Sequence, residues 1–129
     1  MLNSYWKQFK SGTDIRGVAS SGVENEEINL SNEVISKIAL GFVSWLCKRQ
    51  NKEASDISIS IGHDSRISAN RIKDVLISSI GSVGTNIYDC DLASTPAMFM
   101  SILDLKCDAA IEITASHHPF NRNGLKFFV

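Results

Sequence analysis

The sequence predicts a layered α/β fold, built on a mixed β-sheet of about four strands with helices on both faces. Apolar segments of strand and helix character alternate along the chain, with connections short enough for right-handed parallel crossovers. Only about ten residues separate the last two apolar runs, which is too few for a helical crossover. We therefore expect three parallel strands and an antiparallel last strand, within one domain spanning residues 1–129.

Three helices are expected, two from apolar residues that recur with the 3.6-residue period and the third from the residues that mark its start. Asn29 is the predicted N-cap of the first helix, because acidic residues surround that end and basic residues follow the other end. Ser68 is the predicted cap of the second helix, and Thr95, followed by Pro96 at the first helical position, that of the third. The three helices are expected near residues 30–46, 69–80 and 96–105.

The first strand is predicted where isoleucine alternates with serine, which gives one apolar face and one face of small side chains. The four strands are expected at residues 57–61, 85–90, 109–114 and 124–129. Residues 5–23 show little periodicity of either kind. They contain a short segment with two glycines, residues 11–17, which is typical of a tight turn that presents polar groups.

Composition is that of an ordinary globular protein, with 43% apolar and 21% charged residues. A net charge of −1 provides no broad field for nucleic acid or an anionic membrane, so neither is an expected partner. Three widely spaced cysteines argue against a disulfide framework. With no apolar segment of signal-peptide or membrane-span length, a cytoplasmic location is expected, or an organelle such as a plastid if a targeting segment was removed.

Chemically active residues concentrate in the polar loop between the last two strands. It holds Ser116 and two histidines, and the cations Arg122 and Lys126 lie within ten residues of that serine. Ligands of open α/β sheets bind beyond the carboxyl ends of the parallel strands. That edge should gather the loops at residues 62–66, 91–95 and 115–123, and Arg16 would join them if the N-terminal turn folds over it.

Three kinds of site are conceivable for this loop. A serine hydrolase is disfavoured, because Thr114 and His118 occupy the positions where a nucleophile elbow has glycines. A metal site of His63, Asp64 and the two loop histidines lacks the paired spacings that hold zinc. A phosphoserine, by contrast, needs backbone donors and nearby cations, which this loop and its surroundings offer. Solvated surface cations remain the alternative for each basic residue taken singly.

Three motifs resemble those of the α-D-phosphohexomutases, the superfamily of phosphoglucomutases and phosphomannomutases. Thr-Ala-Ser-His-His-Pro followed by Asn-Arg-Asn-Gly-Leu-Lys-Phe-Phe is similar to the family's active-site loop. Residues 11–17 resemble its N-terminal Gly-Thr-x-Gly-x-Arg-Gly element, and residues 62–66 resemble its Gly-x-Asp-x-Arg element. The motifs stand in the family's order, and with the pattern of strands and helices the resemblance covers essentially the whole chain.

The resemblance implies a role for each matching residue. Ser116 would carry the exchangeable phosphoryl group, with one phosphoryl oxygen as a ligand of a single Mg²⁺ ion. His117 and Lys126 would be the acid/base candidates, and Arg16 would support the phosphoserine electrostatically. Asp64 and Arg66 are expected to brace the loops. The implied function is interconversion of hexose 1-phosphate and hexose 6-phosphate, of glucose, mannose or both, through a bisphosphorylated intermediate.

The chain departs from the family pattern in three respects. His118 stands where asparagine is common, and the N-terminal element lacks a glycine between Asp14 and Ile15. Family members also have four domains, and the motifs of the later three, including the acidic metal loop that would complete the Mg²⁺ site, do not occur here. We therefore expect a nearly complete domain I that is inactive alone and works with the remaining domains. The alternative is a non-catalytic phosphate-recognising or interaction module derived from this domain.

Overall fold

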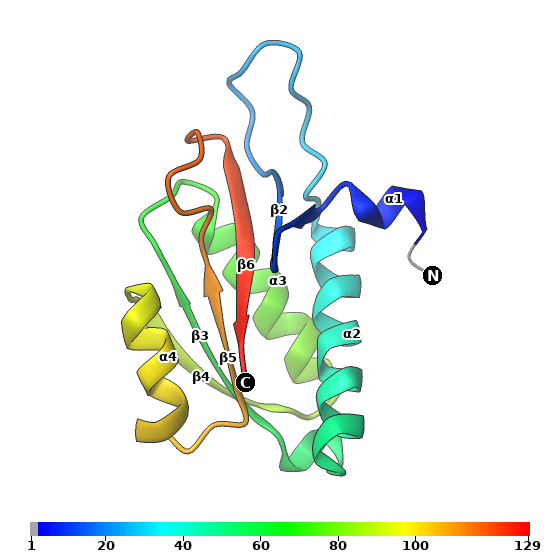
Figure 1. Cartoon of the computed structure of the whole chain (residues 1–129), viewed down its shortest axis with the longest axis vertical. Helices are drawn as coiled ribbons and strands as arrows, with labels where there is room; N and C mark the ends of the chain where they lie inside the picture. Colours follow the sequence, from blue (N-terminus) through cyan, green and yellow to red (C-terminus); the bar gives the residue numbers. More distant parts are fainter. Residues whose placement is uncertain (1–2) are drawn as a thin grey trace.

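The computed structural model describes residues 3–129, which form a single six-stranded mixed sheet with the strand order β1-β2-β6-β5-β3-β4 (Figure 1). β3 pairs parallel with β4 and β5, and β6 pairs antiparallel with β5. The fold class and the antiparallel last strand are thereby confirmed. The strands are β1 (Lys10–Ser11), β2 (Asp14–Val18), β3 (Ser58–His63), β4 (Asn86–Leu92), β5 (Ala109–Ile113) and β6 (Arg122–Phe128).

The sheet is larger than the expected four strands, because the N-terminal segment adds β1 and β2. These two strands form a hairpin that turns at Gly12, whose positive φ of 62° suits glycine. β2 then pairs antiparallel with β6, with Ile15 opposite Leu125. The apolar and polar residues of β2 alternate too weakly to predict a strand. Backbone pairing with β6 stabilises the extended conformation that the sequence pattern does not indicate.

Helices cover both faces of the sheet, and β3 shows how the two layers are built. Ile59 and Ile61 enter the core that α2 and α3 also line, whereas Ser60 points the other way and its hydroxyl lies 2.6 Å from that of Ser101 in α4. The helical elements are α1 (Ser4–Lys7), α2 (Asn32–Gln50), the 3₁₀ helix η1 (Ala54–Asp56), α3 (Ala69–Ser82) and α4 (Thr95–Asp104). Among the described residues no helix is both long and apolar enough to cross a bilayer.

The predicted cap of the first helix was wrong by two residues. Ser31 is the N-cap of α2, and its hydroxyl oxygen accepts a hydrogen bond from the Val34 N–H at 3.3 Å. Asn29 instead accepts from the Val18 N–H at 2.7 Å through Oδ1. Its side chain therefore ties the end of β2 to the segment before α2, a long-range contact that local sequence does not reveal.

The other two caps also differ in detail. Ser94 caps α4 by accepting from the Ala97 N–H at 3.2 Å, so Thr95 is already helical. Ser68 occupies the cap position of α3 but makes no side-chain cap bond there. Its hydroxyl oxygen accepts a hydrogen bond from the Asn123 amide of β6 at 2.9 Å, which joins the start of α3 to the end of the loop that carries Ser116.

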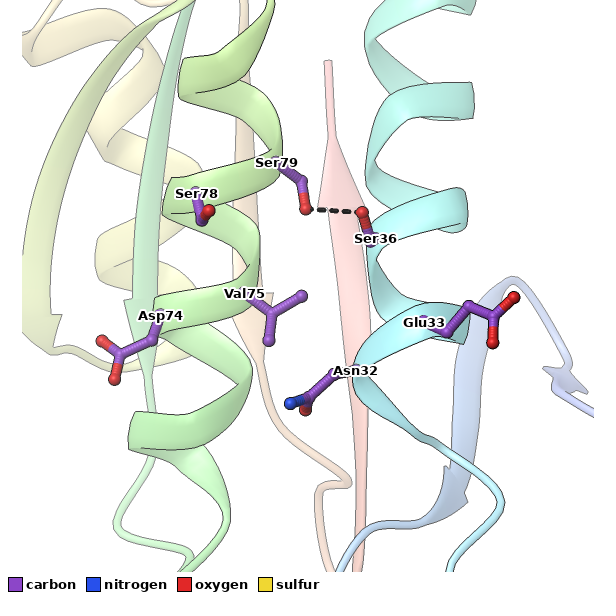
Figure 2. A pocket seen from close by; sticks show the side chains of 7 residues that line it. All are labelled: Asn32, Glu33, Ser36, Asp74, Val75, Ser78 and Ser79. Carbon is purple, nitrogen blue, oxygen red and sulfur yellow. Dashed lines mark hydrogen bonds between the residues drawn. The ribbon is translucent and has the colours of Figure 1, made fainter.

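A groove separates α2 from α3 on the outer surface of the helical layer (Figure 2). It encloses about 420 Å³ and is lined mainly by small polar side chains and by Glu33 and Asp74. A hydrogen bond of 2.7 Å from Ser79 to Ser36 bridges the two helices there. The groove is formed by helices α2 and α3, away from the loop that carries Ser116.

Candidate active site

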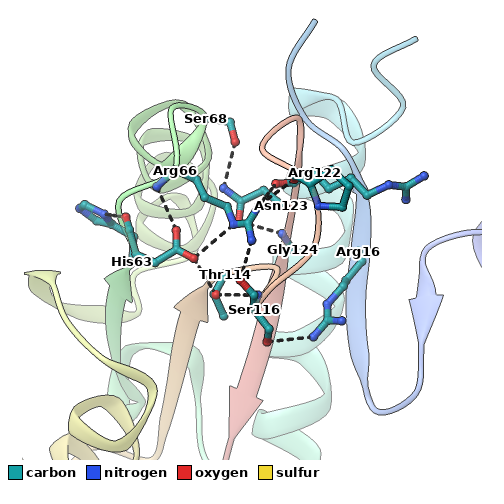
Figure 3. Close-up of polar contacts among 11 residues, drawn as sticks. Arg16, His63, Arg66, Ser68, Thr114, Ser116, Arg122, Asn123 and Gly124 are labelled. Carbon is teal, nitrogen blue, oxygen red and sulfur yellow. Dashed lines mark hydrogen bonds and ion pairs between the residues drawn. The ribbon is translucent and has the colours of Figure 1, made fainter. Parts of the chain in front are cut away.

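Ser116 lies in the loop between β5 and β6, at the carboxyl end of the parallel strands (Figure 3). The residue is exposed, and its φ of 55° places it in the left-handed region that non-glycine residues seldom occupy. Its N–H donates to Thr114 Oγ1 at 3.0 Å. Strained backbone of this kind is often found at functional sites, and here it presents the serine hydroxyl to solvent.

Arg66 holds the Ser116 loop in place through three backbone carbonyl groups. Its guanidinium donates to the carbonyl oxygens of Ser116 at 2.6 Å, Pro119 at 2.8 Å and Arg122 at 3.2 Å. A planar guanidinium with five donors suits this role, because it can reach several acceptors at once.

Asp64 in turn orients both Arg66 and the start of the loop. Its carboxylate accepts from the Arg66 N–H at 3.1 Å, from Arg66 Nε at 3.3 Å and from the Thr114 hydroxyl at 2.7 Å. The prediction that Asp64 and Arg66 brace the loop is therefore confirmed by their contacts. Thr114 is a member of this brace that the sequence did not single out.

Arg16 reaches Ser116 from the other side, because β2 runs beside β6. Its Nη2 donates to Ser116 Oγ at 3.3 Å and to Asp14 Oδ2 at 3.1 Å. The N-terminal element thus does fold over this edge of the sheet. Gly124 makes the approach possible, since a Cβ atom there would collide with the carbonyl of Ile15 and the side chain of Arg16.

His118 packs against the same guanidinium. Arg16 Nη1 lies 2.7 Å from His118 Nε2, and because arginine can only donate, Nε2 is the acceptor and the imidazole is neutral. Desolvation, followed by the positive charge of Arg16, lowers the pKa of His118, in agreement with that geometry. In this chain His118 is a neutral partner of Arg16.

Lys126 joins the site through Asp14. Its Nζ lies 2.7 Å from Asp14 Oδ2, the same oxygen that accepts from Arg16. From the sequence, Asp14 was expected only as part of a turn. Its spacing of two from Arg16 was the available signal, since residues i and i+2 of a strand share a face.

The remaining candidates are placed differently. His117 is exposed, and its ring stacks on that of His118 with the centroids 6.1 Å apart. Arg122 pairs with Glu26 at 3.2 Å rather than with Ser116. The structure therefore brings Arg16 to Ser116, connects Lys126 through one carboxylate, and leaves His117 facing solvent.

The chemistry of the donor set favours an anion. Arg16, Arg66 and Lys126 bring three positive charges to one edge of the sheet, while Asp14 and Asp64 are engaged with them. Residues 3–129 contain no group of three or more histidine, cysteine, aspartate or glutamate side chains that could hold a metal ion. The described side chains alone thus fit a phosphoryl group on Ser116 better than a metal ion.

Comparisons with known proteins point to one family. A family model described as phosphoglucomutase/phosphomannomutase, α/β/α domain I, matches residues 7–129. A phosphoglucosamine mutase of Helicobacter pylori (strain Shi470) is 40% identical over 89 residues, which are 69% of this chain and 20% of that protein. A phosphoglucomutase/phosphomannomutase of Thermococcus kodakarensis is 37% identical over 105 residues, 81% of this chain and 22% of that protein.

Solved structures share the fold. A phosphoglucomutase/phosphomannomutase family protein from Burkholderia thailandensis superposes with a TM-score of 0.72 at 22% identity, over 99% of this chain and 26% of that one. A protein described as a phosphomannomutase from Thermus thermophilus gives 0.73 at 23% identity, over 93% and 25%. The chain spans about a fifth to a quarter of the length of these relatives. The family model covers nearly all of it, and the chain belongs to the phosphoglucomutase/phosphomannomutase family, of which it is the α/β/α domain I.

Proposed function

We propose that this chain is the phosphoryl-carrying domain of a phosphohexomutase that interconverts hexose 1-phosphate and hexose 6-phosphate. The observation that carries the proposal is the placement of Ser116. An exposed serine in left-handed backbone is held by Arg66 through its carbonyl oxygen and contacted at Oγ by Arg16. Relatives named for different sugars match at 40% and 37% identity, so the proposed substrate class is a hexose phosphate.

In the proposed reaction, a sugar hydroxyl attacks the phosphorus atom of phospho-Ser116. The bond between phosphorus and Ser116 Oγ breaks, and the sugar becomes a bisphosphate while the serine recovers its hydroxyl. Lys126 and His117 are the proposed groups that take the proton of the attacking hydroxyl and return one to Oγ. After the bisphosphate reorients, its other phosphoryl group returns to Ser116.

Arg16 would provide the main charge stabilisation in this step. Its guanidinium already lies 3.3 Å from Oγ, and Asp14 and His118 hold it there without competing for the phosphoryl oxygens. Fixed cations aimed at the transferring group need little rearrangement during the reaction, which is how positioned charges accelerate phosphoryl transfer.

We further propose one Mg²⁺ ion, with a phosphoryl oxygen of Ser116 as its only ligand from this chain. Magnesium binds oxygen ligands and would neutralise charge on the phosphoryl group when bound. The remaining ligands would come from the other domains of the protein, because the described residues hold no suitable cluster. The domain alone is expected to lack turnover.

The test is replacement of Ser116 in the protein that carries the remaining domains. Ser116→Ala is expected to abolish turnover and to prevent phosphorylation by a hexose 1,6-bisphosphate. Ser78→Ala is the matched control, because Ser78 is an exposed serine of α3 in the groove beside α2. A mutase rate near normal in Ser116→Ala contradicts the proposal. Binding of hexose phosphate without phosphoryl exchange would favour a non-catalytic phosphate-recognising module.

A further inference from the structure

Glu112 occupies an unusual place beside the candidate acid/base residue Lys126. The two residues are Cα partners in the antiparallel pair of β5 and β6, and such partners share one face of a sheet with Cβ atoms about 4.5–5.5 Å apart. Ile15 pairs with Leu125, so Asp14 comes next in line on the far side of Lys126. Lys126 therefore stands between two carboxyl-bearing residues on neighbouring strands.

The two carboxyl groups are in opposite situations. Asp14 Oδ2 accepts from Lys126 at 2.7 Å and from Arg16 at 3.1 Å. Glu112 is only 1% exposed, and its buried Oε2 has no hydrogen-bond partner among the residues described. A buried carboxyl group without a partner is costly once it ionises, so it favours any cation that can reach it.

The surroundings of Glu112 offer few other partners. α4 covers this face of the sheet, and Gly62, the Cα partner of Glu112 on β3, lies directly under Met98 of that helix. The titratable or charged groups that act on Glu112 or pair with its strand are His63 and Asp64 from the β3 end, Cys90 of β4 and Lys126 of β6. Of these four groups, Lys126 is the one that carries a positive charge at neutral pH independently of histidine titration.

The pKa of Glu112 is that of a carboxyl group that ionises near neutral pH, where a cation would stabilise the buried carboxylate. Burial, followed by the negative charge of Asp64, raises the pKa of Glu112 to about 7, while His63 acts in the opposite direction. The carboxyl group is therefore neutral in acid and becomes a buried carboxylate as the pH passes through neutrality.

We propose that Glu112 is a positioning residue for Lys126, a second carboxyl partner that takes the ammonium group when it leaves Asp14. The exchange leaves no charge alone, because Arg16 stays paired with Asp14 when Lys126 moves away. Movement between the two carboxyl groups would set how far Lys126 stands from Ser116. The catalytic meaning of this exchange rests on the function proposed above, whereas the pairing itself does not.

The pairing can be tested by carbon-detected NMR titration of the Glu112 carboxyl group in this chain. In Asp14→Asn, Lys126 loses its present partner, and the Glu112 midpoint is expected to fall by about one pH unit relative to wild type. Removal of the Asp14 charge also acts at a distance, so the same substitution is made in a Lys126→Met background. There the fall should be much smaller.

Two outcomes overturn the proposal: an unchanged Glu112 midpoint in Asp14→Asn, or an equal fall in both backgrounds. A measurement on the unaltered chain keeps the test open if Asp14→Asn does not fold. Nuclear Overhauser contacts between the Glu112 Hγ and Lys126 Hε protons should strengthen when the pH rises above the Glu112 midpoint. Contacts that stay constant or weaken across that range count against the pairing.

A kinetic test separates this inference from the proposed function. In the protein with its remaining domains, Glu112→Gln should change the pH dependence of kcat between about pH 6 and 8 and leave KM within about twofold, because its group acts through Lys126. An unchanged pH profile in an active mutase contradicts the positioning role. If Ser116 takes no phosphoryl group but the NMR coupling is present, the proposed function fails and the pairing stands.

Discussion

One face of the sheet forms the apolar core and the other carries the charged residues near Ser116, although the same strands build both faces. Ile111 of β5 and Leu125 of β6 point into the sealed core beneath α2 and α3. Glu112 and Lys126, one residue further along the same strands, point to the face that α4 covers only in part. Because side chains alternate along a strand, a single register places an apolar face and a charged face back to back.

The charged face tolerates buried ionisable groups because of how its charges are arranged and because the opposite face is apolar. Lys126 is paired across strands with Asp14, the raised pKa of Glu112 keeps that unpartnered carboxyl group neutral in acid, and the apolar face contributes the burial that keeps the strands together. Substitutions on the apolar face should therefore change stability at every pH, and substitutions on the charged face should change chemistry or the pH dependence of activity and stability.

The largest effect is expected on the charged face, from Lys126→Met in the protein with its remaining domains. Loss of an acid/base group should lower kcat by about 10² to 10⁴-fold. Stability should change little, because Asp14 keeps Arg16 as a partner. Lys37→Met is the control, because Lys37 is a surface lysine of α2 that pairs with Glu33 of the same helix, and it should leave kcat unchanged. Normal kcat in Lys126→Met would remove this residue from the acid/base role.

The next largest effect is expected on the apolar face. Ile59→Ala truncates a side chain with 0% exposure and should cost about 2–5 kcal/mol in the free energy of unfolding. Ile67→Ala, at 81% exposure, should cost less than about 0.5 kcal/mol. Chemical denaturation measures both, and similar costs for the two variants would contradict the assignment of the core to this face.

A smaller effect is expected from Arg66→Ala, which removes the brace of the loop that carries Ser116. Loss of three bonds from a guanidinium to loop carbonyls should cost about 1.5–3 kcal/mol and speed amide exchange at residues 116–122. Arg66→Lys should recover only part of this, since an ammonium group lacks the planar fork. Exchange rates in Arg66→Ala equal to those of wild type would show that the loop keeps its conformation without Arg66.

Glu112→Met is expected to give a gain in stability, and only at neutral to alkaline pH. The folded-state pKa of Glu112 is raised to about 7, so the folded chain holds this proton more tightly than the unfolded chain does. Wild-type stability should then fall as the pH rises from about 4.5 to about 7. Glu112→Met lacks this loss and should be more stable by about 3 kcal/mol at about pH 8, with no gain at about pH 4, because each unit of pKa difference corresponds to about 1.4 kcal/mol. Thermal unfolding across that range measures the difference, and a gain independent of pH would show that packing is the cause.

Local pattern was sufficient for most of the fold. The 3.6-residue period located α2 and α3, the proline at the first helical position located α4, and the alternation of isoleucine and serine located β3. The hairpin of β1 and β2 was missed, because β2 is stabilised by pairing with β6, more than 100 residues away in sequence, and β1 pairs with β2 alone. Asn29 was misassigned as a cap because its side chain bonds the end of β2, 11 residues earlier, instead of the start of α2.

The site residues that belong to recognisable sequence motifs could be predicted. Ser116, Arg16 and Lys126 were identified from motifs, and the structure connects all three. The roles of Asp14 and Glu112 were not predicted, because both depend on which residues face one another across strands. Which residues lie opposite one another depends on how two distant strands pair in the folded protein, and the sequences of the two strands do not reveal that register.

Intact mass spectrometry is the most direct test of Ser116 as the phosphoryl carrier. The protein with its remaining domains should be incubated with Mg²⁺ and a hexose 1,6-bisphosphate, and then digested to locate the modification. The proposed function predicts one phosphoryl group per chain on Ser116, absent from Ser116→Ala and present in Ser78→Ala. A phosphoryl group on another residue, or an active enzyme that carries none at any point of turnover, would contradict it.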